Sequence, residues 1–290
     1  MKYYKNIAIN KFSYVNVGGI VKKLYIASTT EDIINISTFE KKVRIIGQGS
    51  KILFAFHYDD STYIIDRNDY IKEENDYVEI GSGTPLNKIG IYFENNDLDG
   101  FSKLRSIPGR LGGSIVQNAS CYNQCISDYL IDVKVVLNNK VITKNKEDLA
   151  FSYRNSIFKI IPYIILSARF KKVNKSKLLL SEETNKILLF RKEKQPIDKL
   201  TFGSTFVNFD GYIVSKILDD LHLKGFHLNS GVKVSEKHAN FLEIEKDCSY
   251  EQIMLLLHSL TRVLYKRMGV FFPLEIVIFR ENYFGNQNTV

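Results

Sequence analysis

The chain has 290 residues, of which 44% are apolar and 25% charged, a composition typical of a globular protein with a substantial buried core. This composition excludes general disorder. Forty Lys and Arg residues against 32 Asp and Glu give a net charge of +8, and the basic residues are spread along the chain. Such an excess favours anionic ligands in general, but without a basic stripe it does not indicate nucleic-acid binding.

Cysteine usage and hydropathy predict the cellular compartment. The three cysteines, Cys121, Cys125 and Cys248, are too few for a disulfide scaffold and indicate a reducing environment. Because no set of His and Cys has zinc-ligand spacing, we expect no metal. Residues 1–12 lack the apolar run of a signal peptide, and no apolar stretch reaches the roughly 18 residues of a membrane span. We therefore expect a cytoplasmic protein with no membrane partner.

The first half of the chain predicts short strands alternating with two helices. Thr29 and Asp32 suggest a capping box for a helix that ends at Phe39. Thr84 followed by Pro85 predicts the start of a second helix, with Pro85 in its first position. Runs of β-branched and aromatic residues predict strands at residues 25–27, 43–46, 63–66, 77–80, 133–137 and 163–170.

A polar, lysine-rich stretch at residues 171–177 predicts a domain boundary. Beyond it, Ser181 and the two glutamates that follow predict the start of a helix that must end before Pro196. Apolar residues at helical spacing predict another helix over residues 213–221, ending near Gly225. The sequence therefore predicts a first domain that ends near residue 177 and a second, C-terminal one.

The last helix and strand carry the clearest signals in the chain. Ser249 and Gln252 form a capping box, and Gly269 stands where the helix would end in a left-handed cap. A strand over residues 270–279 is then expected. Glu275 is its only charged side chain, so within an apolar sheet the carboxylate needs a partner and is a functional-site candidate. On an edge strand it would instead face water.

Two glycine-rich turns follow apolar strands, at residues 47–50 (Gly-Gln-Gly-Ser) and 81–84 (Gly-Ser-Gly-Thr). Glycine admits conformations that turn backbone N–H groups towards an anion, so each turn could hold a phosphate. Each could equally be a simple turn. Neither continues to the third glycine of the dinucleotide-binding fingerprint, which argues against a Rossmann fold.

Three further segments could carry chemistry. Residues 106–119 combine three glycines with a proline and predict either a cofactor-binding loop or a structural Ω-loop. In residues 151–159, Arg154 could pair with a carboxylate or phosphate, or could cover a hydrophobic edge. Ser204, in residues 203–208, lacks the elbow of a hydrolytic nucleophile, which leaves a proton donor or a structural hydrogen bond.

Seven segments, in this order, resemble those of the UDP-N-acetylenolpyruvoylglucosamine reductase family and cover nearly the whole chain. They are residues 16–19, 47–53, 107–119, 153–156, 203–204, 235–241 and 274–275. The resemblance implies an α+β fold. Residues 1–177 would form an FAD-binding domain of the vanillyl-alcohol-oxidase (PCMH) type, with two α+β subdomains divided near residues 70–76. Residues 178–290 would form an α+β substrate-binding domain. The length is similar to that of the shorter variety, which lacks an inserted loop with a substrate-contacting tyrosine.

The resemblance also implies an activity. The family reduces UDP-N-acetylenolpyruvoylglucosamine to UDP-N-acetylmuramate for peptidoglycan synthesis, with noncovalent FAD and with NADPH as the reducing substrate. By the same likeness, hydride passes from flavin N5 to C3 of the enol ether and Ser204 protonates C2. Arg154 and Glu275 would stabilise the charge that develops beside the substrate carboxylate. We expect a monomer without a nucleic-acid partner.

The same likeness assigns binding residues. The FAD-binding set comprises Gly47, Gln48, Gly49, Ser50, Lys51, Ile52, Leu53, Pro108, Gly109, Gly112, Gly113, Ser114, Asn118 and Ala119. The substrate-binding set comprises Tyr153, Lys194 and Asn208. The chain also departs from the family pattern: Gln48 and Lys51 stand where Gly and Asn are usual, and Val207 and Phe209 replace a lysine and a proline.

Two other functions stay open at this point. A flavin-dependent alcohol or sugar oxidase of the same fold would bind flavin but would not require Ser204 or Glu275. A non-enzymatic nucleotide-binding module would be colourless. The visible spectrum of the purified protein distinguishes the two flavin-dependent enzymes from the nucleotide-binding module, because bound FAD absorbs blue light.

Overall fold

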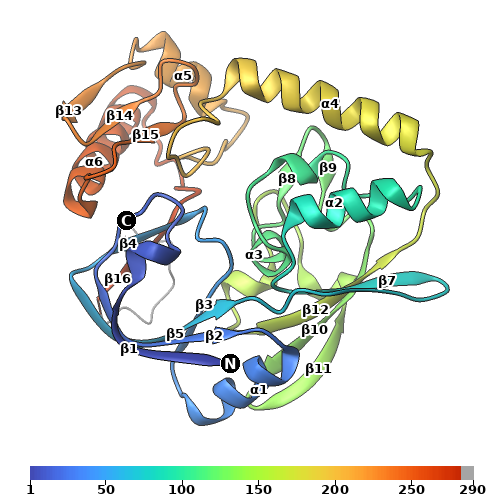
Figure 1. The fold of residues 1–290 in the computed structure, drawn as a ribbon. Helices are drawn as coiled ribbons and strands as arrows, with labels where there is room; N and C mark the ends of the chain where they lie inside the picture. The colour runs from blue at the N-terminus through green and yellow to red at the C-terminus, as the bar shows by residue number, and fades with distance from the viewer. Residues whose placement is uncertain (282–290) are drawn as a thin grey trace. The chain divides into compact units, whose positions relative to one another are not determined.

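A computed structural model describes residues 1–281 (Figure 1). The chain divides into two compact units, each of which is assembled from separate stretches of sequence. Unit 1 comprises residues 1–5, 23–48 and 61–188, and unit 2 comprises residues 6–22, 49–60 and those from Leu189 onward. The division into a cofactor domain and a substrate domain at residues 177 and 178 concerns function and stays a prediction.

The first sheet has the strand order β1-β2-β5-β3. Its strands are β1 (Lys2–Ala8), β2 (Ile20–Ala27), β3 (Val43–Ile46) and β5 (Tyr58–Asp66). In unit 1, β3 pairs in parallel with β5, from Val43 beside Thr62 to Ile46 beside Ile65. The expected strands at residues 25–27, 43–46 and 63–66 are confirmed within these elements.

Helix α1 (Thr30–Phe39) begins and ends where the sequence predicts. The Thr29 hydroxyl accepts a hydrogen bond from the Asp32 N–H at 3.1 Å. The Asp32 carboxylate, however, accepts from the N–H of Ser28 at 2.8 Å, so the expected reciprocal capping box takes a shifted form. Ile33 and Ile36 are its fully buried residues and pack in one apolar cluster with residues of β2, β5, β10 and β12.

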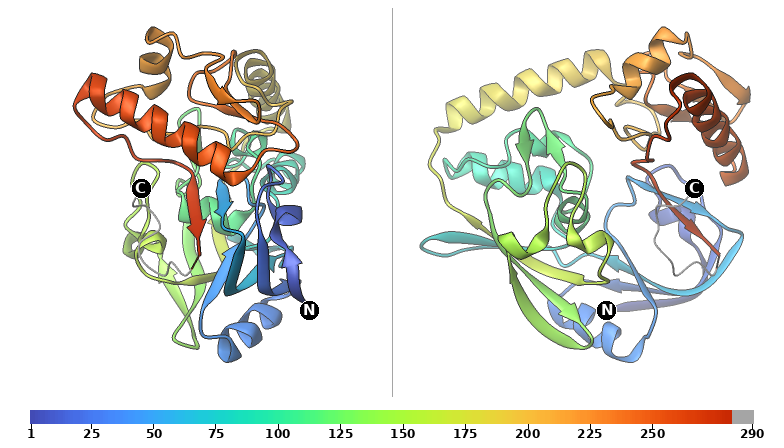
Figure 2. Two further views of the ribbon diagram at one scale, coloured as in Figure 1. Left: turned by 90° about the vertical axis from the view of Figure 1, so that its left-hand side faces the viewer. Right: turned by 180° about the vertical axis from the view of Figure 1, so that it is seen from behind.

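The second sheet of unit 1 is antiparallel and has the order β11-β10-β12-β7-β6. One face of this sheet packs on α2, η2 and α3 through Phe93, Leu104 and Ile115 (Figures 1 and 2). Helix α2 begins one residue later than expected, because Pro85 is its N-cap. The bounds are β6 (Ile71–Glu73), β7 (Tyr77–Gly81), β10 (Leu130–Leu137), β11 (Lys140–Asn145), β12 (Ile164–Lys171), α2 (Leu86–Asn95), η2 (Leu104–Ser106) and α3 (Leu111–Val116).

The remaining short elements of unit 1 connect this sheet to its loops. They are β8 (Ser120–Cys121), β9 (Gln124–Cys125), η3 (Lys146–Leu149) and η4 (Ile157–Lys159). Helix α4 (Lys177–Lys194) follows and contains the division between the units, after Leu188. It begins four residues before the expected Ser181 and ends before Pro196, as predicted.

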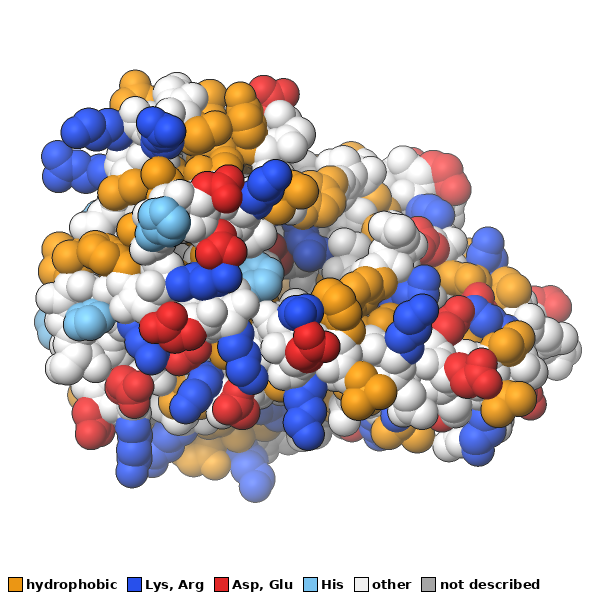
Figure 3. Space-filling view, turned by 90° about the horizontal axis from the view of Figure 1, so that it is seen from above, with side chains coloured by type: hydrophobic (Ala, Val, Ile, Leu, Met, Phe, Trp, Pro, Cys, Tyr) orange, Lys and Arg blue, Asp and Glu red, His pale blue; other side chains and the backbone are white. Residues whose placement is uncertain are grey.

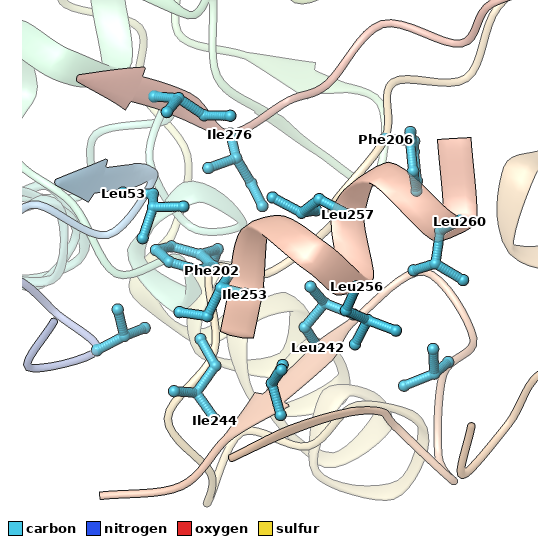
Figure 4. Packing of buried hydrophobic residues seen from close by; sticks show 14 of the residues in the cluster. Leu53, Phe202, Phe206, Leu242, Ile244, Ile253, Leu256, Leu257, Leu260 and Ile276 are labelled. Atoms are coloured by element: carbon cyan, nitrogen blue, oxygen red, sulfur yellow. The ribbon is translucent and has the colours of Figure 1, made fainter. Parts of the chain in front are cut away.

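Unit 2 packs helices α5 and α6 with a three-stranded antiparallel sheet and a parallel pair of strands. Figure 4 shows Leu53 and Phe202 beside Ile253 of α6, and all three side chains are buried in one core. Its elements are η1 (Ile9–Phe12), β4 (Ile52–Ala55), α5 (Val214–Asp220), β13 (His227–Asn229), β14 (Val232–Val234), β15 (Leu242–Ile244), α6 (Tyr250–Met268) and β16 (Val277–Arg280).

Both predicted caps of α6 are confirmed. The Ser249 hydroxyl accepts from the Gln252 N–H, and the Gln252 side chain accepts from the Ser249 N–H at 2.9 Å. Gly269 has φ of 72° and ends the helix in the left-handed conformation that favours glycine.

The strand expected over residues 270–279 is wrong for most of its length, because β16 covers only Val277–Arg280. The preceding residues make isolated contacts with another segment instead, such as the bridge between Leu274 and Phe206. A long apolar run indicates that the segment is buried. The length of a strand depends instead on a partner strand with a continuous backbone edge.

Figure 3 shows Lys and Arg side chains interspersed with Asp and Glu on the face that it displays. This distribution agrees with the scattered charge of the sequence. Among the helices within residues 1–281, none combines the length and the apolar character that a bilayer crossing requires.

Candidate active site

Ser204 and Glu275 lie on two segments of unit 2 that share backbone hydrogen bonds. The Glu275 N–H donates to the Thr205 carbonyl at 2.8 Å, and the Val207 N–H donates to the Pro273 carbonyl at 2.8 Å. Two catalytic candidates that are 71 residues apart in sequence are therefore held on adjacent backbones.

Asn240 anchors the Ser204 segment from a third stretch of chain. Its side-chain amide accepts from the Phe206 N–H and donates to the Phe206 carbonyl, both at 2.9 Å. Its own carbonyl accepts from the Thr205 N–H at 2.8 Å. Asn240 is buried, so loss of any of these three hydrogen bonds would leave a buried polar group unpaired and cost folding free energy. The three bonds therefore fix the backbone that follows Ser204.

Lys51 joins the two catalytic candidates of unit 2. Its ammonium donates to the Ser204 carbonyl at 2.8 Å and lies 3.1 Å from Glu275 Oε1. The Glu275 side chain is 8% exposed and that of Lys51 is 25% exposed. The expectation that Glu275 is buried with a partner is therefore confirmed, and the alternative of a water-facing carboxylate is wrong.

Gly203 permits the close approach of Lys51 to this segment. Its φ of +73° lies in the left-handed region that favours glycine. A Cβ atom at this position would lie 3.3 Å from Lys51 Nζ, which is tighter than an ordinary contact. Glycine at position 203 thus permits both the left-handed backbone conformation and the close approach of the Lys51 ammonium.

Arg154 belongs to unit 1, where a strained turn presents it. Its φ of 55° is uncommon for a residue with a side chain, and such strain is concentrated at functional sites. Its guanidinium donates to Ser120 Oγ at 2.9 Å and lies 5.5 Å from the centre of the exposed Tyr153 ring. Lys159 Nζ donates to the Arg154 carbonyl at 2.6 Å. The convergence of Arg154 with Ser204 and Glu275 stays a prediction.

Hydrogen bonds tie the glycine-rich segments of unit 1 to their neighbours. The Gly47 carbonyl accepts from Arg67 Nη1 at 2.9 Å. The Gly112 N–H donates to the Ser82 carbonyl at 2.8 Å. Arg110 Nη1 donates to the carbonyl of Gly83, which joins the loop at residues 108–119 to the turn at 81–84.

The buried carboxylate of Asp66 lies beside the turn at residues 81–84. Asp66 Oδ1 accepts from the Asn68 N–H at 2.9 Å. Burial raises the pKa of Asp66 to about 6, although hydrogen bonds from the Ser82 side chain and the Asn68 N–H and the positive charges of Arg110 and Arg67 oppose the shift. Gly83 is required beside this group, because a Cβ there would lie 2.4 Å from Asn68 N and 2.6 Å from Asp66 Oδ1.

Two polar atoms of the loop at residues 108–119 suit the binding of a polar cofactor. They are buried and have no hydrogen-bond partner among residues 1–281, which is rare in folded proteins. Around Gly113, in the same loop, no heavy atom of the described residues other than its chain neighbours and the backbone of its own helix lies within 4 Å of an added Cβ. The residues present therefore fit FAD. The two atoms are Arg110 Nε and Asn118 Oδ1.

The other assigned residues are divided between the units. Gly49, Ser50, Ile52 and Leu53 lie in unit 2, where Leu53 belongs to the core. Gln48, Pro108, Gly109, Ser114, Ala119 and Tyr153 lie in unit 1.

The two substrate-binding candidates of unit 2 are placed differently. Lys194 ends α4, is 55% exposed and pairs with Glu193 at 2.6 Å. Asn208 Oδ1 accepts from the Val214 N–H at 3.1 Å and so ties its loop to the start of α5. Asn208 follows Ser204 on the same loop, whereas Lys194 lies on a separate element.

Sequence reasoning did not identify two contributors to the site. Asn240 falls within the segment at residues 235–241 that resembles the family, and this resemblance could have singled it out. Its hydrogen bonds to the Ser204 segment could not be inferred from the sequence. Lys51 was assigned to FAD, and nothing in the sequence indicated its contact with Glu275.

Two family models match long stretches of the chain. The C-terminal domain of UDP-N-acetylenolpyruvoylglucosamine reductase matches residues 195–279, and an FAD binding domain matches residues 22–144. The UDP-N-acetylenolpyruvoylglucosamine reductase of Aquifex aeolicus is 30% identical over 290 residues, which cover 95% of each chain. That of Fusobacterium nucleatum is 27% identical over 97% of this chain and 100% of its own.

A solved structure has the same fold. The crystal structure of UDP-N-acetylenolpyruvylglucosamine reductase from Thermus caldophilus superimposes with a TM-score of 0.82 at 21% identity, over 96% of this chain and 98% of that one. The expected α+β architecture with an FAD-binding domain is confirmed. By sequence similarity along nearly its whole length, the chain belongs to the UDP-N-acetylenolpyruvoylglucosamine reductase family.

Proposed function

We propose that Ser204, Glu275 and Arg154 are the catalytic residues with which this chain reduces UDP-N-acetylenolpyruvoylglucosamine to UDP-N-acetylmuramate. The reaction follows from family membership: the chain is an FAD-dependent oxidoreductase of peptidoglycan synthesis that uses NADPH as reductant. The observation that carries the assignment of residues is the joint placement of Ser204 and the buried Glu275 on adjacent backbones.

Reduction of an enol ether adds a hydride to one carbon and a proton to the other. FAD, held by the glycine-rich segments at Gly47 and residues 108–119, would supply the hydride. We assign the proton at C2 to the Ser204 hydroxyl. An alcohol is a weak acid in water, so this role requires fixed charges and dipoles around the serine. The Lys51 ammonium on the Ser204 carbonyl is one such charge.

We assign Arg154 and Glu275 to the carboxylate side of the substrate. A guanidinium can form two parallel hydrogen bonds with a carboxylate, and Arg154 is held by Ser120 in a fixed orientation. Glu275 brings a negative charge that Lys51 balances, so the pair adds dipole but little net charge beside the developing enolate.

We propose that the glycine-rich segments at Gly47 and at residues 108–119 hold FAD without a covalent bond. The support is the set of buried, unpartnered polar atoms and the open surroundings of Gly113.

We propose that Tyr153, Lys194 and Asn208 bind the UDP-sugar. We further propose a monomer in the cytoplasm, where UDP-sugars and NADPH are available, and light scattering tests the oligomeric state.

The test separates the two halves of the reaction. Ser204→Ala should leave bleaching of the flavin by NADPH unchanged, because no proton at C2 is involved in that step. Re-oxidation by the enolpyruvyl sugar nucleotide should slow by about 100-fold or more. Both rates are measured by anaerobic stopped-flow absorbance.

Two outcomes would contradict these assignments. Equal losses in both half-reactions would show that Ser204 is structural. Normal re-oxidation by the enolpyruvyl compound in both Ser204→Ala and Glu275→Gln would remove the proposed catalytic roles of these two residues.

A further inference from the structure

Lys51 contacts both segments of unit 2 that carry catalytic candidates. Its ammonium lies 2.8 Å from the Ser204 carbonyl oxygen and 3.1 Å from Glu275 Oε1. A lysine ammonium has three N–H donors, so one side chain can hold both partners at once. This contact is distinct from the cofactor role that the family resemblance implies for the position.

The strand pair of unit 2 brings Lys51 and Glu275 together. The Val277 N–H donates to the Lys51 carbonyl at 2.8 Å, and β4 and β16 then run parallel from Ile52 and Val277. Lys51 stands one residue before the first paired residue of β4, and Glu275 stands two before that of β16. Because parallel strands begin at the same edge, the ammonium and the carboxylate meet there.

The Ser204 segment is held on its two sides by different groups. Asn240 fixes Phe206 through both its N–H and its carbonyl, at 2.9 Å each. Lys51 holds the Ser204 carbonyl, over the left-handed turn at Gly203. A change at Lys51 would therefore act on Ser204 itself while the residues after it stay anchored.

We propose that Lys51 is a positioning residue of the active site, which fixes Ser204 through its carbonyl and balances the charge of the buried Glu275. A carboxylate that is 8% exposed is costly without a cation beside it. Small displacements of a proton donor also slow transfer steeply. The inference rests on the proposed catalytic roles of Ser204 and Glu275.

The first experiment compares three variants of the FAD-loaded enzyme. Lys51→Met removes the charge and keeps the length, and Lys51→Arg keeps the charge. Lys233→Met is the matched control, because Lys233 lies 3.7 Å from Glu243, another glutamate of unit 2 that is 10% exposed. FAD content, bleaching by NADPH and re-oxidation by the enolpyruvyl sugar nucleotide are measured for each.

Lys51→Met should keep its FAD, bleach within about twofold of the parent rate and re-oxidise at least about tenfold more slowly. Lys51→Arg should recover most of the lost rate. Lys233→Met should match the parent in all three measurements.

The second experiment needs no activity. Thermal unfolding of the flavin-free protein is compared for Lys51→Met, Glu275→Gln and the double variant. Lys51→Met should lower the midpoint by a few degrees, and adding Glu275→Gln should restore part of the loss, because no unbalanced charge then remains buried. Strictly additive shifts would overturn the charge-balancing role.

The outcomes separate this inference from the proposed function. If Lys51→Met loses FAD, Lys51 is a cofactor ligand and the inference is overturned while the proposed function stands. If Ser204→Ala and Glu275→Gln re-oxidise slowly but Lys51→Met does not, the inference alone fails. If those two variants re-oxidise normally, the proposed catalytic roles of Ser204 and Glu275 fail, and the thermal comparison still decides whether Lys51 balances Glu275.

Discussion

At the scale of single residues, Asp66 makes the stability of unit 1 depend on pH. Its folded-state pKa of about 6 exceeds the ordinary aspartate pKa of 3.8, so the folded protein binds this proton more tightly than the unfolded chain does. The corresponding stabilisation is present below about pH 4 and is lost as the pH rises through 6. The shift corresponds to about 2 to 3 kcal/mol.

Asp66→Asn should therefore gain stability relative to the parent as the pH rises from 4 to 8, by about 2 to 3 kcal/mol. The amide oxygen still accepts the Asn68 N–H, which keeps the local hydrogen bond. Urea unfolding at the two pH values measures the difference. Asp69→Asn, at an exposed carboxylate, is the control, and an equal difference at both pH values would show that Asp66 does not titrate between them.

Glu275 and Lys51 show how far the sequence predicts the site. An isolated charge in an apolar run indicated a buried carboxylate, and this reading needed only local sequence. Its partner lies 224 residues earlier, and the contact exists only because β4 and β16 pair. Nothing in the local sequence of Lys51 indicates that pairing, since non-local strand partners are chosen by the whole fold.

At the scale of elements, helix α3 and the C-terminal end of α6 offer a matched pair of glycines, Gly113 and Gly269. Gly113 is helical and Gly269 is left-handed, and at both positions the described residues leave room for a Cβ. The same substitution therefore separates backbone strain from contact with a ligand.

Gly113→Ala should stabilise the flavin-free protein by roughly 0.5 to 1 kcal/mol, because alanine favours the helix and meets no neighbour. If FAD lies against this loop, the added methyl group should weaken FAD binding by about tenfold or more. Denaturant unfolding and FAD titration measure the two effects. Gly269→Ala should lose about 1 kcal/mol and bind FAD normally; unchanged FAD affinity in Gly113→Ala would remove Gly113 from the cofactor set.

The elements themselves were predicted wherever a local signal was complete. Helix α6 has both caps and an apolar face in its own sequence, and α1 and β10 also carry their signals locally. Residues 270–276 have the composition of a strand, but Pro273 has no N–H to donate and the segment pairs only at single points. The composition of this segment was therefore sufficient to predict its burial but not the length of its strand.

At the scale of the whole molecule, unit 2 depends on residues from the N-terminal part of the chain. Val15, Val17 and Leu53 are buried in its core, and each contributes about 1.5 to 3 kcal/mol. Strand β16 also requires β4 as its partner. These contributions are large against the 5 to roughly 15 kcal/mol that holds a typical domain folded.

A fragment of residues 178–290 should therefore fail to form the native core of unit 2. The expected result is weak near-ultraviolet circular dichroism and strong binding of a hydrophobic dye, with no cooperative thermal transition. The full chain is the control. A fragment with a sharp transition and native-like near-ultraviolet signal would show that the C-terminal residues fold independently.

The interleaving of the two units has a consequence for protein synthesis. The apolar strand β4 leaves the ribosome early, and its partner β16 begins 225 residues later. At elongation rates of about 5 to 20 residues per second, β4 lacks its partner strand for roughly 10 to 45 seconds. Nascent chains should therefore need protection of residues 52–55 by a chaperone, and slower translation of the C-terminal third should increase aggregation during expression.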